Sequence, residues 1–552
     1  MKISKLHLNR ILIFTTMFAM TSCGLFNVKK YETIKLNRAN STLNLVETGS
    51  TTGEVITPDE MKFTYTNYLL NKTFMNAHAY IPSPVVGEAA MTIKVLVPLI
   101  HFSDSYLITA VQRGIIEDKI RAAFEGNTQF LNVKDFYKKA SNNLINFEFV
   151  YTDWYSAGSS SQCTNEQKTY SIVDNVVKNG TINGNPIDSK EFDSNKDGFI
   201  DAIYAVYDVH NYVESHDNND NLWAYTLDNS NVVRNKENPV ARNFSWASCD
   251  FLDKGYGNGD TMVDPHTFIH ETGHLFGLFD YYDYNKNSSP ICALDMMDLN
   301  ICDLNAYSRL ILGWMKPYIV YGNATINLNE VKNKKSCIVI VSDKSTLTKE
   351  KSTGKYLFNP FNEYMLVEYF DFNSLPNNID LVSGYSPAKL DGLTSYTTSG
   401  YKIYHVNSPQ LLASKQENTT NYEFYYSHEP VEKKNTYFLN IISNTTKGST
   451  KRAETDLFNV LETTYDDPEF DYFNEIALIA KQTVNENSYR SLYVHKNEGD
   501  ELNIEKPSND FLYFKGDTFD SKNYSNYFIH GKNDNGVILD NNDTFSTVIN
   551  FN

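Results

Sequence analysis

The chain has 552 residues and a formal net charge of -18 at pH 7, with 49 Lys and Arg against 67 Asp and Glu. This length exceeds what one ordinary hydrophobic core fills, so we expect two or more domains. The acidic excess argues against a nucleic-acid partner and against a polybasic membrane patch. No run of eighteen or more apolar residues occurs, so no segment of the mature protein is expected to span a membrane.

Residues 1–22 have the pattern of a signal peptide. Basic residues precede an apolar stretch over 11–20, and the small residues Thr21 and Ser22 follow it. Cys23, directly after this pair, resembles the cysteine of a bacterial lipobox, which is lipidated and becomes the first residue of the mature protein. The alternative is ordinary cleavage near Ser22 with an incidental cysteine. We expect an exported lipoprotein on the extracellular surface of a bacterium, attached to the membrane through Cys23.

Residues 23–90 are expected to form a tether. Their composition is rich in Ser, Thr, Asn and charged residues, and their hydrophobic periodicity is weak.

The patterns of strands and helices alternate in the next part of the chain. A nearly continuous apolar run over 91–100 predicts a central strand, and alternation over 145–151 predicts another. Helical spacing predicts helices over about 108–124 and 133–141. This order of elements is typical of an α/β domain.

An oxygen-rich loop follows between residues 193 and 201. Asp193, Asn195 and Asp197 stand at alternate positions, Gly198 is the sixth residue, and Asp201 closes the loop before an apolar strand. Carboxylate and amide oxygens at this spacing can surround one Ca²⁺ ion. The loop is not a full EF-hand, because its twelfth position is no glutamate and a strand follows it. The alternative is a solvated acidic turn.

The segment His270-Glu271-Thr272-Gly273-His274 carries the strongest chemical signal. On a helix, two histidines four residues apart share one face, so both imidazoles can reach a single metal ion. Glu271 lies beside them, where it can take a proton from metal-bound water. We therefore predict a hydrolytic Zn²⁺ site with Glu271 as its base.

Signals at both ends define the helix that carries this segment. Asp264 is placed to cap it, Pro265 suits its first turn, and Gly277 ends it. Because glycine takes a left-handed backbone at little cost, the chain can reverse there and return Asp280 to the metal as a third ligand. Three protein ligands leave one position open, as in catalytic zinc sites.

Other acidic residues and one more histidine are alternatives for the third ligand. No glutamate occurs between residues 272 and 329, which leaves three aspartates as outside candidates: Asp295, Asp298 and Asp303. His266 lies one turn before His270, but three successive ligands on one helix are awkward, so we expect it to pack or to support the site.

The wider motif, His270-Glu271-x-x-His274-x-x-Gly277-x-x-Asp280 followed by Met296-Met297 and by residues 304–314, resembles the immune inhibitor A family of secreted bacterial metalloproteases, in the metzincin group. The resemblance implies that His270, His274 and Asp280 bind zinc and that Glu271 is the general base. It also implies a methionine turn under the metal, with Met297 favoured over Met296. One departure is the sequence after Met297, where larger residues replace the small ones expected.

The resemblance extends from about residue 92 to the end of the chain, and it is diffuse away from the zinc helix. After Pro317, short alternating runs predict a β-rich C-terminal region over 318–552, for which a sandwich is one architecture. The expected fold is thus an α/β (α+β) metzincin-like catalytic domain over 91–317 followed by this β-rich region. Cys292 and Cys302 could form a disulfide across the methionine turn, and because the cysteines other than Cys23 are odd in number, at least one thiol stays free.

The predicted protein is a secreted, lipid-anchored zinc endopeptidase that acts on extracellular proteins or peptides. Its tether has room for an inhibitory pro-segment, and Tyr282 and Tyr307 are candidates to stabilise the transition state. One alternative is an inactive surface adhesin on a protease scaffold, and intact His270, Glu271 and His274 speak against it. A second alternative is a metal hydrolase of a non-peptide bond.

Overall fold

The computed structural model describes the chain from residue 54 to residue 550 with gaps. The described residues are 54–62, 81–107, 109–210, 222–229, 231–253, 263–278, 281, 294–321, 326, 331–332, 336–341, 348–358, 363–383, 385, 396–407, 412–415, 422–425, 476–478, 509, 512–514, 518–519 and 549–550. The predicted signal peptide and Cys23 therefore lie outside the described residues.

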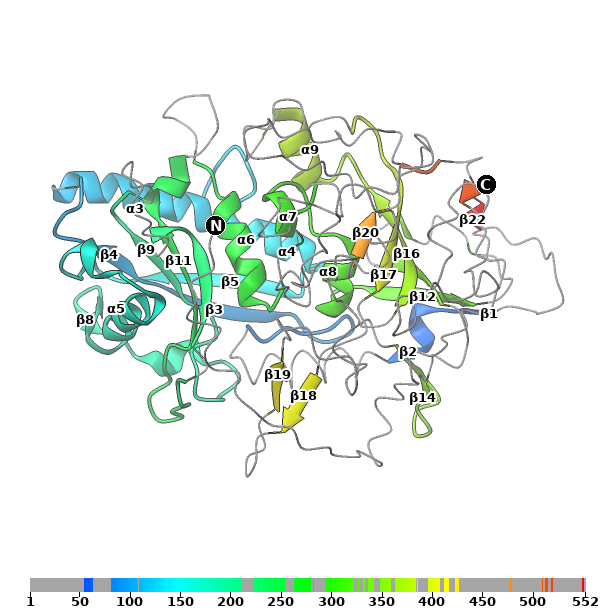
Figure 1. The fold of residues 1–552 in the computed structure, drawn as a ribbon, viewed down its shortest axis with the longest axis horizontal. Coiled ribbons are helices and arrows are strands. Elements are labelled where there is room, and N and C mark those ends of the chain that lie inside the picture. Colours follow the sequence, from blue (N-terminus) through cyan, green and yellow to red (C-terminus); the bar gives the residue numbers. More distant parts are fainter. Residues whose placement is uncertain are drawn as a thin grey trace, which may run out of the picture.

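A mixed sheet forms the centre of the N-terminal part of the molecule (Figure 1). Its strand order is β10 (Tyr225–Asp228), β11 (Asn243–Ser248), β9 (Tyr204–Tyr207), β4 (Leu99–His101) and β6 (Tyr155–Ser156). These strands run parallel, except for the edge strand β10, which is antiparallel to β11. Glu271 of the predicted metal site lies against β10, as described below.

The strand predicted over 91–100 is two strands in the structure. β3 (Met91–Val97) pairs in parallel with β5 (Ile145–Tyr151), whereas β4 pairs with β9. Pro98 separates them because proline has no N–H for the ladder, although its carbonyl still accepts from the N–H of Val206 at 2.9 Å. The prediction for 145–151 is confirmed at both ends.

Helices cover both faces of this sheet. α3 (Ala110–Glu125), α4 (Val133–Ala140) and α6 (His266–Leu275) pack on one face, and α5 (Glu166–Asn179) packs on the other. The side chains of β9 alternate accordingly, since Tyr204 and Val206 join the core of the first face and Ala205 and Tyr207 join that of the second.

The predicted helices over 108–124 and 133–141 are confirmed as α3 and α4, with small shifts at their ends. Local caps explain their starts. Thr109 and Gln112 form a reciprocal capping box on α3, and the Asn132 side chain accepts from the third N–H of α4.

A second sheet of six strands lies beside the first part (Figure 1). Its order is β1 (Glu54–Ile56), β12 (Lys316–Tyr321), β13 (Ser336–Ile340), β16 (Glu363–Phe370), β17 (Gly400–Asn407) and β20 (Ile476–Leu478). All neighbours are antiparallel except β12 and β13. β1 comes from the segment expected to be a tether, and α9 (Leu375–Ser383) connects β16 towards β17.

The remaining elements are short. They are β2 (Met61–Lys62), β7 (Thr181–Ile182), β8 (Asn185–Pro186), α7 (Met296–Leu299), α8 (Ala306–Ile311), β14 (Thr348–Lys349), β15 (Tyr356–Leu357), β18 (Leu412–Lys415), β19 (Tyr422–Tyr425), β21 (Thr518–Phe519) and β22 (Ile549–Asn550).

One hydrophobic core joins the second sheet to helix α6. Ile56 of β1, Leu366 of β16 and Tyr404 of β17 belong to the same buried cluster as Phe268 and Met297. The fold is therefore a mixed α/β fold whose second sheet packs directly on the elements of the predicted metal site.

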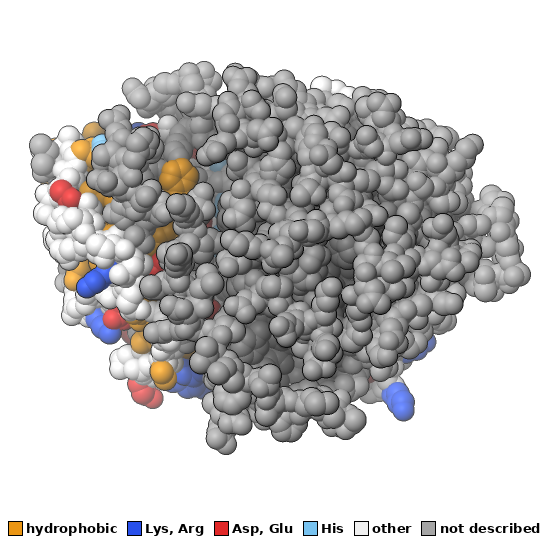
Figure 2. All heavy atoms as spheres, viewed as in Figure 1, with side chains coloured by type: hydrophobic (Ala, Val, Ile, Leu, Met, Phe, Trp, Pro, Cys, Tyr) orange, Lys and Arg blue, Asp and Glu red, His pale blue; other side chains and the backbone are white. Residues whose placement is uncertain are grey.

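The described surface carries mixed charge. Acidic, basic and hydrophobic side chains are interspersed over one end of the face in Figure 2. Within the described ranges, no helix has both the length and the apolar character that crossing a membrane requires.

Candidate metal centre

Helix α6 begins and ends close to the predicted positions. Asp264 lies one residue before the N-cap position, which Pro265 occupies, and its carboxylate accepts from the N–H of His266 at 2.9 Å. Gly277 has a φ of 91°, and the N–H of Leu278 donates to the carbonyl of Gly273 at 2.9 Å. The left-handed glycine thus reverses the chain directly after His274, as predicted.

Backbone carbonyls fix the rings of both histidines. Nδ1 of His270 lies 2.8 Å from the carbonyl oxygen of Met296, and Nδ1 of His274 lies 2.8 Å from that of Leu278. A carbonyl can only accept, so each Nδ1 carries a proton, and in the neutral ring Nε2 presents its lone pair.

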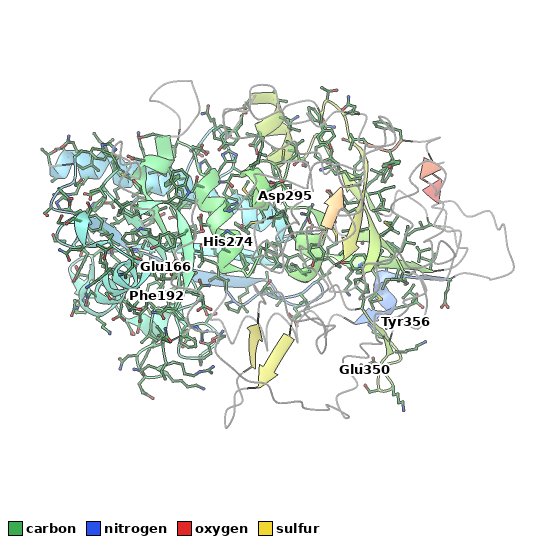
Figure 3. All side chains as sticks on the ribbon, viewed as in Figure 1. Glu166, Phe192, His274, Asp295, Glu350 and Tyr356 are labelled. Carbon is green, nitrogen blue, oxygen red and sulfur yellow. The ribbon has the colours of Figure 1, made fainter. Side chains whose placement is uncertain are left out.

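The two Nε2 atoms converge. They are 3.1 Å apart, and the rings of His270 and His274 stand at 86° to each other. Two nitrogens that bind one tetrahedral zinc at 2.0–2.1 Å are about 3.3 Å apart. The separation, the tautomers and the type of donor therefore fit a zinc ion. Figure 3 shows His274 near the middle of the molecule, in the region between the two sheets.

Glu271 is held by the edge strand β10. Its Oε2 accepts from the hydroxyl of Thr226 at 2.9 Å, and its backbone carbonyl accepts from the hydroxyl of Ser245 at 3.3 Å. Glu271 is buried. A carboxylate held in this way beside His270 has the chemistry of a general base.

Met297 packs directly under α6. A Cβ built on Gly273 would lie 2.1 Å from Sδ of Met297, so a larger residue at this point of the helix would require the Met297 side chain to move. Met297 is thus the methionine that lies against Gly273, between the two histidines in the sequence. Two buried phenols also hold the helix, because Tyr137 donates to the carbonyl of Ile269 and Tyr204 to that of Phe268, both at 2.7 Å.

The predicted third ligand, Asp280, lies outside the described residues. The described residues on either side of it contact the site. Leu278 supplies the carbonyl for His274, and the N–H of Tyr281 donates to the carbonyl of Met297 at 2.9 Å. No group of three or more His, Cys, Asp or Glu within the described ranges is arranged to hold a metal ion. The described chain thus supplies two of the three predicted zinc ligands.

Two of the outside candidates are engaged elsewhere. The carboxylate of Asp295 accepts from the N–H groups of Met297 and Asn305, both at 2.7 Å. Asp303 lies 3.6 Å from the guanidinium of Arg309. Asp298 is buried in α7. Asp295 and Asp303 line a polar chamber.

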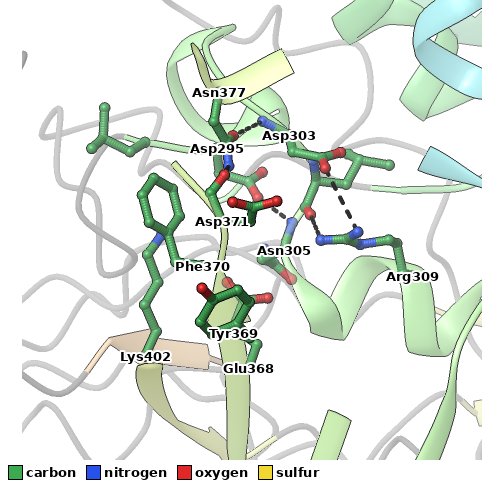
Figure 4. A pocket seen from close by; sticks show the side chains of 12 residues that line it. Asp295, Asp303, Asn305, Arg309, Glu368, Tyr369, Phe370, Asp371, Asn377 and Lys402 are labelled. Atoms are coloured by element: carbon green, nitrogen blue, oxygen red, sulfur yellow. Dashed lines mark hydrogen bonds and ion pairs between the residues drawn. The ribbon is translucent and has the colours of Figure 1, made fainter. Parts of the chain in front are cut away.

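This polar chamber lies between the segment 294–309 and the second sheet (Figure 4). Its volume of about 10 Å³ is the space of roughly one water molecule. Burial raises the pKa of Asp295 to about 7, although the two N–H groups that it accepts from lower it. Lys402 of β17 is buried with its ammonium 4.5 Å from the ring centroid of Phe370. The chamber was not predicted from the sequence, although a charged residue at an inward-facing position of a strand, here Lys402, is a signal for one.

Backbone amides shape the predicted calcium loop. The carboxylate of Asp193 accepts from the N–H groups of Asp197 and Gly198, at 3.0 and 2.9 Å, and that of Asp201 accepts from Ser194 at 2.8 Å. Gly198 has a φ of 95°, so the sharp turn expected there exists.

The carboxylates of this loop are crowded. Burial raises the pKa of Asp201 to about 7, and burial also raises that of Asp197. Asn195 accepts from the N–H of Asp197 at 2.9 Å and donates to its carboxylate at 3.2 Å. Hard oxygens of this kind suit Ca²⁺, and calcium binding there stays a prediction.

The remaining predicted residues have mixed outcomes. Cys302 is a buried free thiol, and Cys292, its predicted disulfide partner, lies outside the described residues. Tyr307 is fully buried, with its ring centroid 6.4 Å from that of Tyr281. Tyr282 lies outside the described residues.

Comparison with known proteins gives no relative. No family model matches the chain, and no curated protein matches it.

Proposed function

We propose that the protein is a zinc-dependent endopeptidase of metzincin-like architecture, related to the immune inhibitor A family. The observation that carries this proposal is the pair of Nε2 atoms of His270 and His274, 3.1 Å apart on tautomers fixed by backbone carbonyls. Two histidines that only packed against each other would not require both Nε2 lone pairs to point at one place.

His270, His274 and Asp280 would hold the zinc ion, which when bound polarises a carbonyl and lowers the pKa of water. Glu271 accepts the proton of the attacking water and passes it to the leaving amine. Thr226 orients the carboxylate of Glu271 for both transfers. The buried surroundings of Glu271 limit bulk water around that proton.

The position of β10 favours a peptide substrate. This strand lies at the edge of its sheet, and Thr226 within it contacts the base Glu271. An extended peptide can add to a sheet edge through backbone hydrogen bonds, which would bring a scissile bond alongside the base. A small ester or phosphate substrate has no extended backbone that could pair with such an edge.

Zinc stoichiometry combined with cleavage of casein tests this function. The chelated protein should be inactive, and one equivalent of zinc should restore cleavage. Zinc binding without cleavage of any protein would favour the adhesin alternative. Turnover of small esters without cleavage of casein would favour a non-peptide hydrolase.

A further inference from the structure

A buried histidine cluster lies at the start of helix α6, away from the converging Nε2 atoms. His266 is 2% exposed, and its ring lies between two buried carboxylates. Nδ1 is 2.6 Å from Oδ1 of Asp264, and Nε2 is 3.1 Å from Oδ1 of Asp380. Ionised carboxylates only accept hydrogen bonds, so both ring nitrogens must donate and the ring is an imidazolium.

The cluster joins segments far apart in the sequence. Asp380 belongs to α9, and its Oδ2 accepts from the N–H of Cys302 at 2.7 Å, just after the methionine turn. The ring of Tyr385 stacks on His266 with centroids 3.8 Å apart, and its hydroxyl donates to Oδ2 of Asp264 at 3.0 Å. The zinc helix, the loop after Met297 and the α9 segment therefore meet at one cation.

The buried cation of the cluster is paired with two buried carboxylates. Burial lowers the pKa of His266, but Asp380 and Asp264 outweigh it and raise the pKa to about 10. Phe130 packs edge-on against the ring at 4.7 Å. Each carboxylate oxygen of Asp264 and Asp380 has a donor, so no oxygen of the pair is buried without one. Removing one partner would leave an uncompensated buried charge, which strongly destabilises the folded state.

We propose that His266 is a positioning residue of the metal site, and that the α9 segment of the C-terminal region acts on the zinc helix through it. As a permanent cation, His266 holds α6 in register with the loop that carries Met296 and Met297. That register sets the distance from the carbonyl of Met296 to His270. The inference rests on the proposed zinc peptidase function, and it makes residues up to 385 part of the active unit.

The charge of His266 is tested first, in the full chain with ¹⁵N-labelled histidine. Both ring nitrogens of one histidine should stay protonated from pH 6 to pH 9, and His266→Gln should remove that pair of signals. A wild-type protein in which no histidine keeps both protons at pH 8 would overturn the proposal. This experiment needs no substrate, so it stands even if the protein proves not to be a peptidase.

The positioning role is tested with Asp380→Asn. One amide oxygen cannot replace two carboxylate oxygens, so Cys302 or His266 loses its acceptor. We expect zinc affinity to weaken by about 10- to 100-fold and kcat to fall similarly, with KM within about threefold. The pKa of His266 should fall towards its ordinary value. Tyr385→Phe, which removes a single hydroxyl, should act in the same direction more weakly.

The matched control is Asp250→Asn. Asp250 also pairs with a histidine, since Oδ2 lies 3.0 Å from Nδ1 of His210, but that histidine side chain is 64% exposed. This variant should keep wild-type zinc affinity and kcat. An Asp380→Asn protein that folds and binds zinc as tightly as the control would overturn the positioning role.

Discussion

The side chains of His270, His274 and Glu271 are each oriented by a hydrogen bond to a residue outside helix α6. Met296 and Leu278 orient the two imidazoles through their carbonyls, and Thr226 orients Glu271. The adjacent residues His270 and Glu271 therefore have different roles. His270 presents a nitrogen lone pair that can bind a metal, and Glu271 presents a carboxylate oxygen that can accept a proton.

Replacing Glu271 should therefore separate metal binding from catalysis. Glu271→Ala should keep one zinc per chain while proteolysis falls by about 100- to 10,000-fold, because a general base is lost and no ligand is. Zinc analysis and casein cleavage measure the two effects. Glu237→Ala, at a side chain that is 87% exposed, is the control. Turnover within about tenfold of wild type would remove Glu271 from the mechanism.

The third ligand can be identified by metal analysis. Asp280→Ala should weaken zinc binding by at least about 100-fold, whereas Asp283→Ala and Asp298→Ala should keep it. Asp280→His should retain the metal, because imidazole is also a zinc ligand. An Asp280→Ala protein with wild-type zinc affinity would redirect the search to the aspartates after residue 294.

At the scale of elements, helix α6 is in close contact with α7, which carries Met297. Sδ of Met297 occupies the space in which any side chain at residue 273 would begin. α7 is in turn held by Asp295, whose carboxylate also accepts from Asn305 at the start of α8.

Two helical glycines make a matched test of this contact. Gly273→Ala should destabilise the protein by about 1–3 kcal/mol because the methyl group meets Met297. Gly114→Ala, in α3 with open space around its Cβ, should instead stabilise by about 0.5–1 kcal/mol. Urea denaturation followed by circular dichroism measures both. Equal effects of the two substitutions would contradict the packing of Met297 on α6.

At the scale of the whole molecule, the predicted calcium loop links stability to pH. The pKa of Asp201 is raised to about 7 and that of Asp197 is also raised, so the folded state holds protons that the unfolded chain releases above about pH 4. Without metal, these two carboxyl groups therefore make the free energy of unfolding fall as pH rises from about 4 to about 7. Calcium binds the ionised carboxylates, so it should offset this loss.

We therefore expect calcium to raise the melting temperature more at pH 8 than at pH 5, by roughly 1–3 °C at millimolar concentration. Thermal unfolding with and without a calcium-selective chelator measures this. Asp197→Asn should abolish the rise, whereas Asp174→Asn on α5 should keep it. Identical melting curves with calcium and with chelator at both pH values would identify an ordinary acidic turn.

Anchoring to the cell is also a property of the whole chain. Cys23→Ser should move the protein from the membrane fraction to the soluble fraction, because the lipid on Cys23 is the proposed attachment. Cell fractionation with immunodetection measures this. Retention of the variant in membranes would indicate an uncleaved signal sequence or a membrane-bound partner.

The sequence by itself determined the features that depend on neighbouring residues. Gly277 and the spacing of His270 and His274 define helix α6 because left-handed turns and helical periodicity are local effects. The predicted cap was wrong by one residue, since Pro265 occupies the N-cap position and Asp264 precedes it. The strand over 145–151 follows from its alternation in the same way.

Only the tertiary structure decided which distant groups meet. The carbonyl of Met296 that orients His270, the contact of Met297 with Gly273, and the pairing of β1 with β12 join residues from more than 20 to more than 200 positions apart. The same is true of Asp380 on His266, 114 residues away. No local pattern specifies such pairs, since burial and hydrogen bonding select them only after the two sheets have packed around one core.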